Sequence, residues 1–230
     1  MVTKTLVIPA AGSGKRMQKE VPKPYLELRG ISILERTIRR FLELEGLKQV
    51  VVVASESYIE LTRKKLSSLL PDTIRGDVVP GGGERQHSIS NALSRIIAAD
   101  LVMVHDAVRP FVKKEHIEAC CEAAFEAGAA VLGIPATDTI KCVTKDHYVE
   151  NTPPRTAMWQ TQTPQVFQRE VLIKAYKQAR QDDFLGTDDS SLVERIGQKV
   201  KIVEGDQMNM KITYPQDFET AKLMIDQNWM

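Results

Sequence analysis

The sequence predicts an α/β protein built on a doubly wound, mostly parallel sheet. Apolar runs such as residues 50–54, VVVVA, are continuous rather than alternating, which suits strands buried on both faces of a parallel sheet. These runs alternate with segments of helical periodicity, so the chain repeats a strand, a crossover helix and a further strand. Its 230 residues are enough for one substantial core, and we expect a single domain over residues 1–230. Ligands of such sheets bind at the carboxyl ends of the strands.

Each element is predicted from its local pattern. The first helix has apolar residues at positions 34, 38, 41 and 42 and charged residues on its other side. The last helix has Pro215 in its first turn, where proline is favoured. The predicted strands are residues 5–8, 50–54, 77–80, 101–105, 129–134 and 200–203. The predicted helices are residues 33–44, 56–70, 84–98, 114–127, 169–181, 188–196 and 215–226.

Residues 136–154 break the alternation at a point where another helix is expected. Two short β-prone pieces, residues 139–143 and 148–150, flank a polar centre at Lys145 and Asp146, which predicts a β-hairpin. An isolated two-stranded hairpin is marginally stable in water, so this one needs a surface to pack on. We expect it to protrude as a dimerisation arm and to pack against its copy in a second subunit, which makes a homodimer. Packing of the hairpin on its own domain is the alternative.

Composition and charge restrict the classes of partner. Lys plus Arg is 31 and Asp plus Glu is 30, so the net charge of +1 gives no electrostatic argument for a nucleic acid or an anionic membrane. No apolar run reaches the roughly 18–20 residues of a membrane-spanning helix, and no signal-peptide pattern follows Met1, so we expect a cytoplasmic protein. The cysteines at positions 120, 121 and 142 form no CxxC pair and are interpreted as reduced and structural.

Residues 6–23, LVIPAAGSGKRMQKEVPK, carry the first predicted phosphate site. An apolar strand ends there in a glycine-rich loop, whose bare backbone N–H groups can approach anionic oxygens. The loop matches neither common phosphate motif. Met17 stands where the dinucleotide fingerprint has its third glycine, and no Ser or Thr follows Lys15 as in a Walker A motif.

Three cations, Lys15, Arg16 and Lys23, follow the glycines of this loop. Pro22 and Pro24 forbid a regular helix there, so we expect the chain up to residue 25 to wrap around its ligand in an extended form. The three cations would then surround a backbone cradle for a polyphosphate. A glycine-rich strand exit with ordinary solvated cations is the alternative.

A second glycine-rich loop follows the strand predicted at residues 77–80. Gly81, Gly82 and Gly83 are consecutive, which costs backbone entropy and indicates a forced turn or a close approach to a flat ligand. Backbone groups held there could read the edge of a nucleobase, with the Ser88 hydroxyl as a further hydrogen-bonding group. A plain turn before a helix is the alternative.

Asp106 directly follows the strand predicted at residues 101–105, so it lies at the edge where both loops end. A carboxylate beside a polyphosphate is repelled unless a divalent cation separates them, and Mg²⁺ prefers oxygen ligands. Asp106 is therefore the metal-ligand candidate, whereas His105 is interpreted as a packing or hydrogen-bonding residue. Arg109 could pair with Asp106, bind phosphate or only tie its loop to its neighbours. Lys211, just before the last helix, is expected to return to the same edge as a further cation.

Several ordered motifs together resemble one known family. The segments PAAGSGKRM with VPKPY, GGGERQHSI, VHDAVRPF, TDTIK, WQTQTPQ, GTDDSSLVE and NMKIT occur in the order found in the 2-C-methyl-D-erythritol 4-phosphate cytidylyltransferases. The resemblance covers essentially the whole chain. It implies a Rossmann-like fold of the nucleotide-diphospho-sugar transferase type, a homodimer with interlocking hairpin arms, and Mg²⁺ as the cofactor.

The resemblance implies a role for each matching position. Arg16, Lys23 and Lys211 would be catalytic and stabilise charge at the α-phosphorus of CTP, and Asp106 would hold the metal. The positions implied for CTP binding are Ala10, Ala11, Gly12, Ser13, Gly14, Lys15, Gly81, Gly82, Arg85, Ser88, Asp106 and Ala107. The positions implied for binding of the sugar phosphate are Arg109, Thr139, Arg155, Thr163 and Thr187, part of them from the partner's arm.

The implied reaction joins CTP and 2-C-methyl-D-erythritol 4-phosphate to 4-diphosphocytidyl-2-C-methyl-D-erythritol and pyrophosphate, in non-mevalonate isoprenoid biosynthesis. The substrate phosphate has a second pKa of about 6, so at neutral pH it is largely a dianion that can attack without a general base. Catalysis would consist of positioning and charge neutralisation. The alternatives are a ribitol 5-phosphate cytidylyltransferase, a sugar-1-phosphate nucleotidyltransferase that uses another base, and a nucleotide-binding regulatory domain without turnover.

Overall fold

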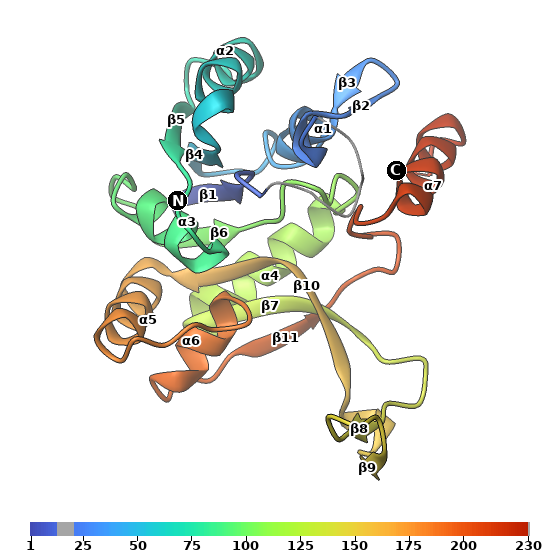
Figure 1. Ribbon diagram of the computed structural model, residues 1–230. Coiled ribbons are helices and arrows are strands. Elements are labelled where there is room, and N and C mark those ends of the chain that lie inside the picture. The colour runs from blue at the N-terminus through green and yellow to red at the C-terminus, as the bar shows by residue number, and fades with distance from the viewer. Residues whose placement is uncertain (13–20, 230) are drawn as a thin grey trace.

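The computed structural model describes residues 1–12 and 21–229, and its centre is a seven-stranded sheet with the strand order β11-β7-β10-β6-β1-β4-β5. Helices cover both faces of this sheet (Figure 1). The strands of the sheet are β1 Lys4–Pro9, β4 Leu47–Ala54, β5 Arg75–Pro80, β6 Leu101–Val104, β7 Ala129–Pro135, β10 Trp159–Gln168 and β11 Lys201–Glu204. The helices are α1 Ile33–Arg39, α2 Ile59–Leu69, α3 Arg85–Leu93, α4 Lys114–Ala127, α5 Arg169–Gln181, α6 Asp189–Arg195 and α7 Pro215–Asp226.

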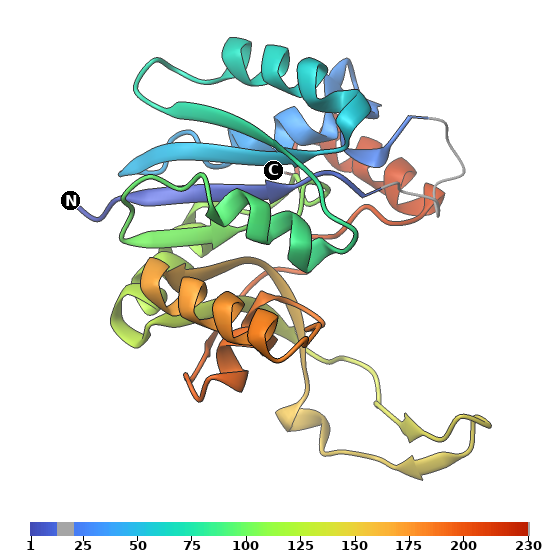
Figure 2. The same ribbon diagram turned by 60° about the vertical axis from the view of Figure 1, so that its left-hand side comes forward.

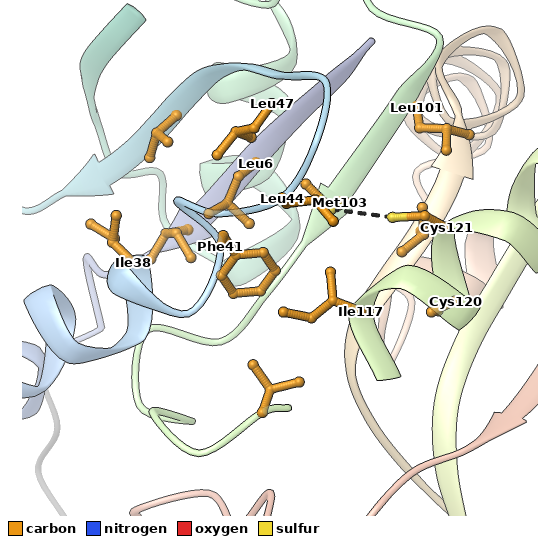
Figure 3. Close-up of a cluster of buried hydrophobic side chains, with 14 of the residues drawn as sticks. Leu6, Ile38, Phe41, Leu44, Leu47, Leu101, Met103, Ile117, Cys120 and Cys121 are labelled. Atoms are coloured by element: carbon orange, nitrogen blue, oxygen red, sulfur yellow. Dashed lines mark hydrogen bonds between the residues drawn. The ribbon is translucent and has the colours of Figure 1, made fainter. Parts of the chain in front are cut away.

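The alternation of side chains along β1 explains the two layers of helices. Leu6 and Ile8 are fully buried in a core shared with α1, α2 and α4, whereas Val7 is fully buried in a second core shared with α3, α5 and α6. Figure 3 shows Leu6, Phe41 and Ile117 of the first core, with Leu6 next to Phe41. A strand that is apolar on both faces therefore has a helical layer on each side, and the predicted doubly wound sheet is confirmed.

The predicted helices all form, with small differences at their ends. Ser32 caps α1, because its side chain accepts a hydrogen bond from the Glu35 N–H and Glu35 reaches back to the Ser32 N–H. The first helix ends at Arg39, where residue 44 was predicted, and α3 ends at Leu93, where residue 98 was predicted. Turns follow both helices and continue the apolar pattern without helical geometry.

Strand β10 is a central strand that the sequence pattern did not predict. It pairs antiparallel with β6 and with β7, whereas the other neighbouring pairs of this sheet are parallel. Its sequence, WQTQTPQVFQ, lacks a continuous apolar run and contains Pro164, a residue that argues against a central strand. The register shifts between Thr161 and Gln165, so the proline lies in an irregularity of the ladder. Such an irregularity lets a proline occupy the middle of a sheet. The Thr163–Pro164 peptide bond is cis.

The segment after the first loop differs from the predicted extended chain. Residues 13–20 lie outside the described part, and Lys23–Tyr25 form a single 3-10 turn. A short antiparallel pair, β2 Glu27–Leu28 and β3 Ile31–Ser32, follows this turn and was not predicted. Tyr25 is stacked on Tyr58 with ring centroids 4.3 Å apart and hydrogen bonds to Thr62 of α2, so the turn is tied to the α2 layer.

The hairpin consists of β8 Cys142–Val143 and β9 Val149–Asn151, which are shorter than the predicted pieces. Figure 2 shows it extending away from the sheet and the helices. Three of its large apolar side chains are exposed, namely Val143 at 49%, Tyr148 at 75% and Val149 at 57%. Exposed apolar side chains on a two-stranded hairpin favour a partner surface. The dimerisation role of the hairpin remains a prediction.

Two of the three cysteines are buried, as expected of structural cysteines, whereas the third is exposed. Cys120 and Cys121 are buried and Cys142 is exposed, and all three are free thiols. Burial raises the pKa of Cys121 to about 12, so its thiol is protonated and unreactive at neutral pH. Among the described residues, no helix is both long and apolar enough to span a membrane.

Candidate active site

A pocket of about 650 Å³ lies at the carboxyl edge of the sheet. The loop after β1, the turn at Lys23, the loop after β5, the loop after β6 and the segment before α7 contribute to it. Its described lining residues are Pro9, Ala10, Ala11, Gly12, Lys23, Pro24, Gly82, Gly83, Glu84, Arg85, Ser88, Asp106, Ala107, Val108 and Lys211. The four stretches singled out in the sequence therefore meet in one cavity, where the doubly wound topology predicts a ligand.

The two glycine-rich loops pack directly against each other. A Cβ atom on Gly81 would lie 2.5 Å from the Ala11 Cβ, and one on Gly82 would lie 2.5 Å from the His87 Cβ. Gly81 also donates its N–H to the carbonyl of Ala54 at 2.9 Å, which joins its loop to the end of β4. A Cβ atom at either position would clash at these distances, so both positions require glycine. The loops that follow the two strands therefore form a wall of exposed backbone.

The Ser88 hydroxyl supports this wall. Ser88 is 5% exposed, and its Oγ accepts a hydrogen bond from the Gly82 N–H at 3.0 Å. A hydroxyl that accepts one hydrogen bond still has a proton to donate. Gly82 and Ser88 thus present one hydrogen-bonding unit toward the pocket.

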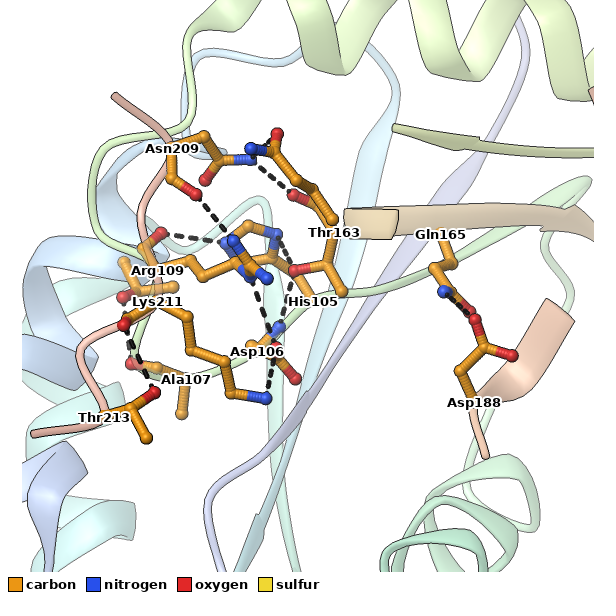
Figure 4. A network of polar contacts seen from close by, with 12 residues as sticks. His105, Asp106, Ala107, Arg109, Thr163, Gln165, Asp188, Asn209, Lys211 and Thr213 are labelled. Atoms are coloured by element: carbon orange, nitrogen blue, oxygen red, sulfur yellow. Dashed lines mark hydrogen bonds and ion pairs between the residues drawn. The ribbon is translucent and has the colours of Figure 1, made fainter. Parts of the chain in front are cut away.

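Asp106 is the centre of a cluster of cations (Figure 4). Lys211 Nζ lies 2.9 Å and Arg109 Nε 3.4 Å from its Oδ2, while Arg85 Nε lies 3.9 Å from its Oδ1. Burial alone would raise the pKa of the Asp106 carboxyl. The charges of Lys211, Arg85 and Arg109 outweigh this effect and hold the pKa well below its usual range. The carboxylate is therefore ionised at any pH near neutrality.

His105 and Thr163 form a chain of hydrogen bonds that ends at the backbone N–H of Asp106. The Thr163 hydroxyl accepts the Asp106 N–H at 3.1 Å and lies 3.1 Å from His105 Nδ1, while His105 Nε2 lies 3.0 Å from the Arg109 carbonyl. Burial lowers the pKa of His105 to about 4, so the ring is neutral at pH 7. A neutral ring must donate from Nε2 to the Arg109 carbonyl, and its Nδ1 then accepts from the Thr163 hydroxyl. His105 is thus a hydrogen-bonding residue, as the sequence indicated.

Arg109 is tied to the segment before α7. Its Nη1 donates to the Asn209 carbonyl at 2.6 Å, and the fully buried Asn209 side chain donates to Gln162 Oε1 at 3.1 Å and to the Thr163 carbonyl at 2.9 Å. Burial lowers the pKa of Arg109, and Asp106 opposes this effect. Sequence reasoning missed Gln162 and Asn209, because an amide in a polar stretch carries no signal of a buried network.

Asp189 is a second residue that sequence reasoning missed. Its carboxylate lies 2.8 Å from Arg85 Nη2 and accepts a hydrogen bond from the Tyr176 hydroxyl. The segment GTDDSSLVE contains this aspartate, but the pattern gave no sign that a residue about 100 positions after Arg85 would contact it. A contact between residues that distant in sequence depends on the tertiary fold, which local patterns do not encode.

Other predicted site residues lie away from the described pocket lining. Thr139, Arg155 and Thr187 are exposed, and Arg155 Nη1 donates to the Thr137 carbonyl at 3.0 Å. Thr163 lines the network behind Asp106 rather than the pocket itself. The remaining predicted positions, Ser13, Gly14, Lys15 and Arg16, lie outside the described residues.

The donor set fits a metal that is shared with a ligand. The described residues contain no group of three or more His, Cys, Asp or Glu that could hold a metal alone. Two carboxylates, Asp106 and Glu84, line the pocket. Mg²⁺ is commonly held by one or two carboxylates together with substrate phosphates and water. Arg85 Nε lies 3.9 Å from Asp106 Oδ1, beyond hydrogen-bond distance, so Arg85 does not occupy this oxygen as a hydrogen-bond donor.

Comparison with known proteins agrees with the ordered motifs. The family model of the 2-C-methyl-D-erythritol 4-phosphate cytidylyltransferases, IspD, matches residues 4–227. The chain is 42% identical over 220 residues to the enzyme of that name from Caldanaerobacter subterraneus subsp. tengcongensis, covering 95% of this chain and 97% of the relative. It is 43% identical over 224 residues to that of Symbiobacterium thermophilum, covering 97% and 93%.

Solved structures give the same result. The 4-diphosphocytidyl-2C-methyl-D-erythritol synthase of Anaerococcus prevotii superposes with a TM-score of 0.87 at 29% identity, over 98% of this chain and 96% of that one. The 2-C-methyl-D-erythritol 4-phosphate cytidylyltransferase of Thermus thermophilus gives a TM-score of 0.78 at 31% identity, over 98% and 100%. The resemblance of the motifs thus extends to the whole fold, and the chain belongs to the 2-C-methyl-D-erythritol 4-phosphate cytidylyltransferase family.

Proposed function

We propose that the pocket around Asp106 is where this chain binds CTP and activates its α-phosphate. As a member of its family the chain is a nucleotidyltransferase, which joins CTP and 2-C-methyl-D-erythritol 4-phosphate to 4-diphosphocytidyl-2-C-methyl-D-erythritol and pyrophosphate in isoprenoid biosynthesis. The observation that carries the proposal is the buried carboxylate of Asp106 with three cations around it at the carboxyl edge of the sheet. That arrangement suits a polyphosphate bound with a divalent cation.

The triphosphate would lie along the loop after β1. Ala10, Ala11 and Gly12 line the pocket, and a Cβ on Gly12 would meet no atom of the described residues within 4 Å. Lys23, which is 8% exposed and lines the same pocket, would face the phosphates. The proposed triphosphate contacts also include Ser13, Gly14, Lys15 and Arg16, which are assigned from the sequence alone.

The cytosine would be read by the second glycine-rich loop. Gly82 and Ser88 form a hydrogen-bonded unit at the pocket wall. The Ser88 hydroxyl and the backbone of Gly81 and Gly82 have fixed positions, because the two loops pack together without room for a side chain. A rigid set of donors and acceptors can distinguish the edge of one base from that of another.

Mg²⁺ is the proposed cofactor, with Asp106 as its protein ligand. When bound there, it would supply neutralisation of charge on the triphosphate and on the departing pyrophosphate. Lys211 pairs with Asp106 Oδ2 and its side chain is 43% exposed, so it can turn toward the α-phosphate when CTP enters. Lys211, Lys23 and Arg16 would stabilise the charge that develops there.

The attacking group needs no general base. The phosphate of the second substrate has a second pKa of about 6 and is largely a dianion at neutral pH. Asp106 at the pocket is ionised, and the buried His105 next to it is neutral with both ring nitrogens in hydrogen bonds, so neither is suited to move a proton. Positioning in line with the leaving pyrophosphate is then the main requirement.

The second substrate would bind between the pocket and the arm of a partner subunit. Arg109, Thr139, Arg155, Thr163 and Thr187 remain the proposed contacts, and residues 136–154 the proposed dimerisation arm of a single domain over residues 1–230. The exposed apolar side chains of the hairpin support this arrangement. A cytoplasmic location remains part of the proposal.

Pyrophosphate release tests the proposal. The wild-type chain with CTP, Mg²⁺ and 2-C-methyl-D-erythritol 4-phosphate should release pyrophosphate, and ribitol 5-phosphate should be a much poorer substrate. Asp106→Asn should raise the Mg²⁺ concentration that gives half-maximal rate, while circular dichroism shows a retained fold. An unchanged metal titration in that variant would remove Asp106 as the metal ligand. Binding of CTP without any release would contradict the enzymatic role of the pocket.

A further inference from the structure

Arg85 lies between two carboxylates at unequal distances. Its Nη2 is 2.8 Å from Oδ2 of Asp189, the first residue of α6, and its Nε is 3.9 Å from Oδ1 of Asp106. The shorter contact is a close ion pair, and the longer one exceeds hydrogen-bond distance. The pocket-lining guanidinium is therefore drawn toward α6 rather than toward the centre of the site.

Asp189 is itself fixed from the side of α5. Asp189 is 1% exposed, and its Oδ1 accepts a hydrogen bond from the Tyr176 hydroxyl. Burial, followed by the negative charge of Asp189, raises the pKa of Tyr176 well above its usual value, so the hydroxyl stays protonated and remains a donor. Oδ2 receives the ion pair from Arg85 without a well-aligned hydrogen bond. The charge of Asp189 is thus a larger influence on Arg85 than a hydrogen bond between the two side chains.

The spacing between α3 and α6 does not depend on Arg85. Gln86, the next residue of α3, donates to the Phe184 carbonyl at 2.9 Å and accepts the Gly186 N–H at 2.9 Å. Asp188 caps α6 and accepts a hydrogen bond from Gln165 of β10 at 2.7 Å. These hydrogen bonds of Gln86 and Asp188 hold the backbone around Asp189. Loss of the Asp189 charge should therefore leave that backbone in place.

We propose that Asp189, supported by Tyr176, is a positioning residue that holds Arg85 away from Asp106. The consequence is that Oδ1 of Asp106 stays open to the divalent cation and the triphosphate. Among the described residues, the two carboxylates share the cations Arg85, Arg109 and Lys211. If Asp189 were neutral, Asp106 alone would attract all three, and Arg85 would move into a direct pair with Oδ1. This inference rests on the proposed function of the pocket and adds the specific task of Asp189.

The test replaces the Asp189 carboxylate by an amide of the same shape. In a crystal structure of Asp189→Asn, the separation of Arg85 Nε and Asp106 Oδ1 should shorten from 3.9 Å to hydrogen-bond distance. Binding of Mn²⁺ to the protein with CTP, followed by electron paramagnetic resonance, should weaken about tenfold, a size expected for neighbouring charges. Tyr176→Phe should act in the same direction with a smaller effect, because it leaves the charge in place.

A matched control tests whether the loss of any ion-paired aspartate would have the same effect as the loss of Asp189. Asp77 on β5 is partly buried, with 18% of its side chain exposed, and pairs with Arg75 at 2.7 Å, and it is not among the described residues that line the pocket. Asp77→Asn should leave Mn²⁺ binding and the position of Arg85 unchanged. An Asp77→Asn effect as large as that of Asp189→Asn would overturn the inference, because the loss would then not be specific to α6.

A double variant tests whether Asp189 acts through Arg85. In an Arg85→Met background, Asp189→Asn should cause no further loss of Mn²⁺ binding. An equal further loss, or an unmoved Arg85 in the single variant, would overturn the inference. These readouts do not require turnover. If the wild-type chain binds CTP and Mn²⁺ but releases no pyrophosphate, the proposed function fails while the positioning of Arg85 can still be judged.

Discussion

Changing the buried His105 to glutamine should make the stability of the protein less sensitive to pH. His105 is fully buried, and burial lowers its pKa from 6.5 to about 4. Between these two values the unfolded chain binds a proton that the folded protein does not. The contribution to the free energy of unfolding is therefore complete above pH 6.5 and is lost as the pH falls toward 4.

The size of this effect follows from the shift. The pKa of His105 is 6.5 in the unfolded chain and about 4 in the folded protein. This difference contributes about 3 kcal/mol to the free energy of unfolding, of which about 2 kcal/mol is lost between pH 7.5 and pH 5. Glutamine keeps a donor that can reach the Arg109 carbonyl, which His105 Nε2 contacts at 3.0 Å. It does not titrate. His105→Gln should therefore lose less stability than the wild type between pH 7.5 and pH 5.

Urea unfolding at pH 7.5, 6.5 and 5, followed by circular dichroism, measures this difference. The other histidines and the carboxylates titrate in both proteins, so subtraction of the two pH profiles isolates His105. Limiting the range to pH 5 and above avoids most carboxyl titration. Two parallel pH profiles would refute the reasoning, since they would mean that His105 has the same pKa in the folded and unfolded states.

Three further perturbations test other parts of the site. Lys211→Ala should lower kcat by about 10²–10³, because a charge-stabilising group is lost, and the pyrophosphate assay measures it; a loss below tenfold would contradict a catalytic role. Gly81→Ala should cost about 1–3 kcal/mol in urea unfolding and raise the KM for CTP, because its Cβ would lie 2.5 Å from the Ala11 Cβ. Gly12→Ala is its matched control for stability, since a Cβ there meets no described atom within 4 Å, and equal losses of stability in both variants would disprove the packing argument. Deletion of residues 138–150 should yield monomers in light scattering, and a persisting dimer would mean that the arm does not hold the subunits together.

The fold was predictable where burial gave a simple pattern. Strands such as β4 are buried on both faces, so their apolar runs were visible without an alignment of any kind. Strand β10 was not visible, because its buried Gln162 and Gln165 are satisfied by hydrogen bonds to Asp206 and Asp188. Their partners are distant in sequence, and Pro164 argued against a strand. A polar central strand can be recognised only after its partners are known.

The candidate site was predictable to the extent that its residues follow strands directly. Asp106, Gly82 and Ala10 each come at or just after the end of a strand, so the topology of the sheet brings them together. Asp189 and Asn209 reach the site through helix packing and a long connecting segment, and no local rule connects them to it. The sequence thus predicted the residues around the ligand better than the residues that orient them.

The pH dependence of the reaction should follow the substrate rather than the protein. The cations around Asp106 keep its carboxyl ionised near neutral pH, and the pKa of His105 of about 4 keeps that ring neutral, so the charge of this network is constant between pH 6 and 8. The phosphate that attacks gains its second charge with a pKa of about 6. The rate should therefore rise through this range with a midpoint set by the free substrate. The low-activity variant Lys211→Ala should show the same midpoint in the pyrophosphate assay, and a midpoint displaced by a full unit would mean that a protein group supplies the titration.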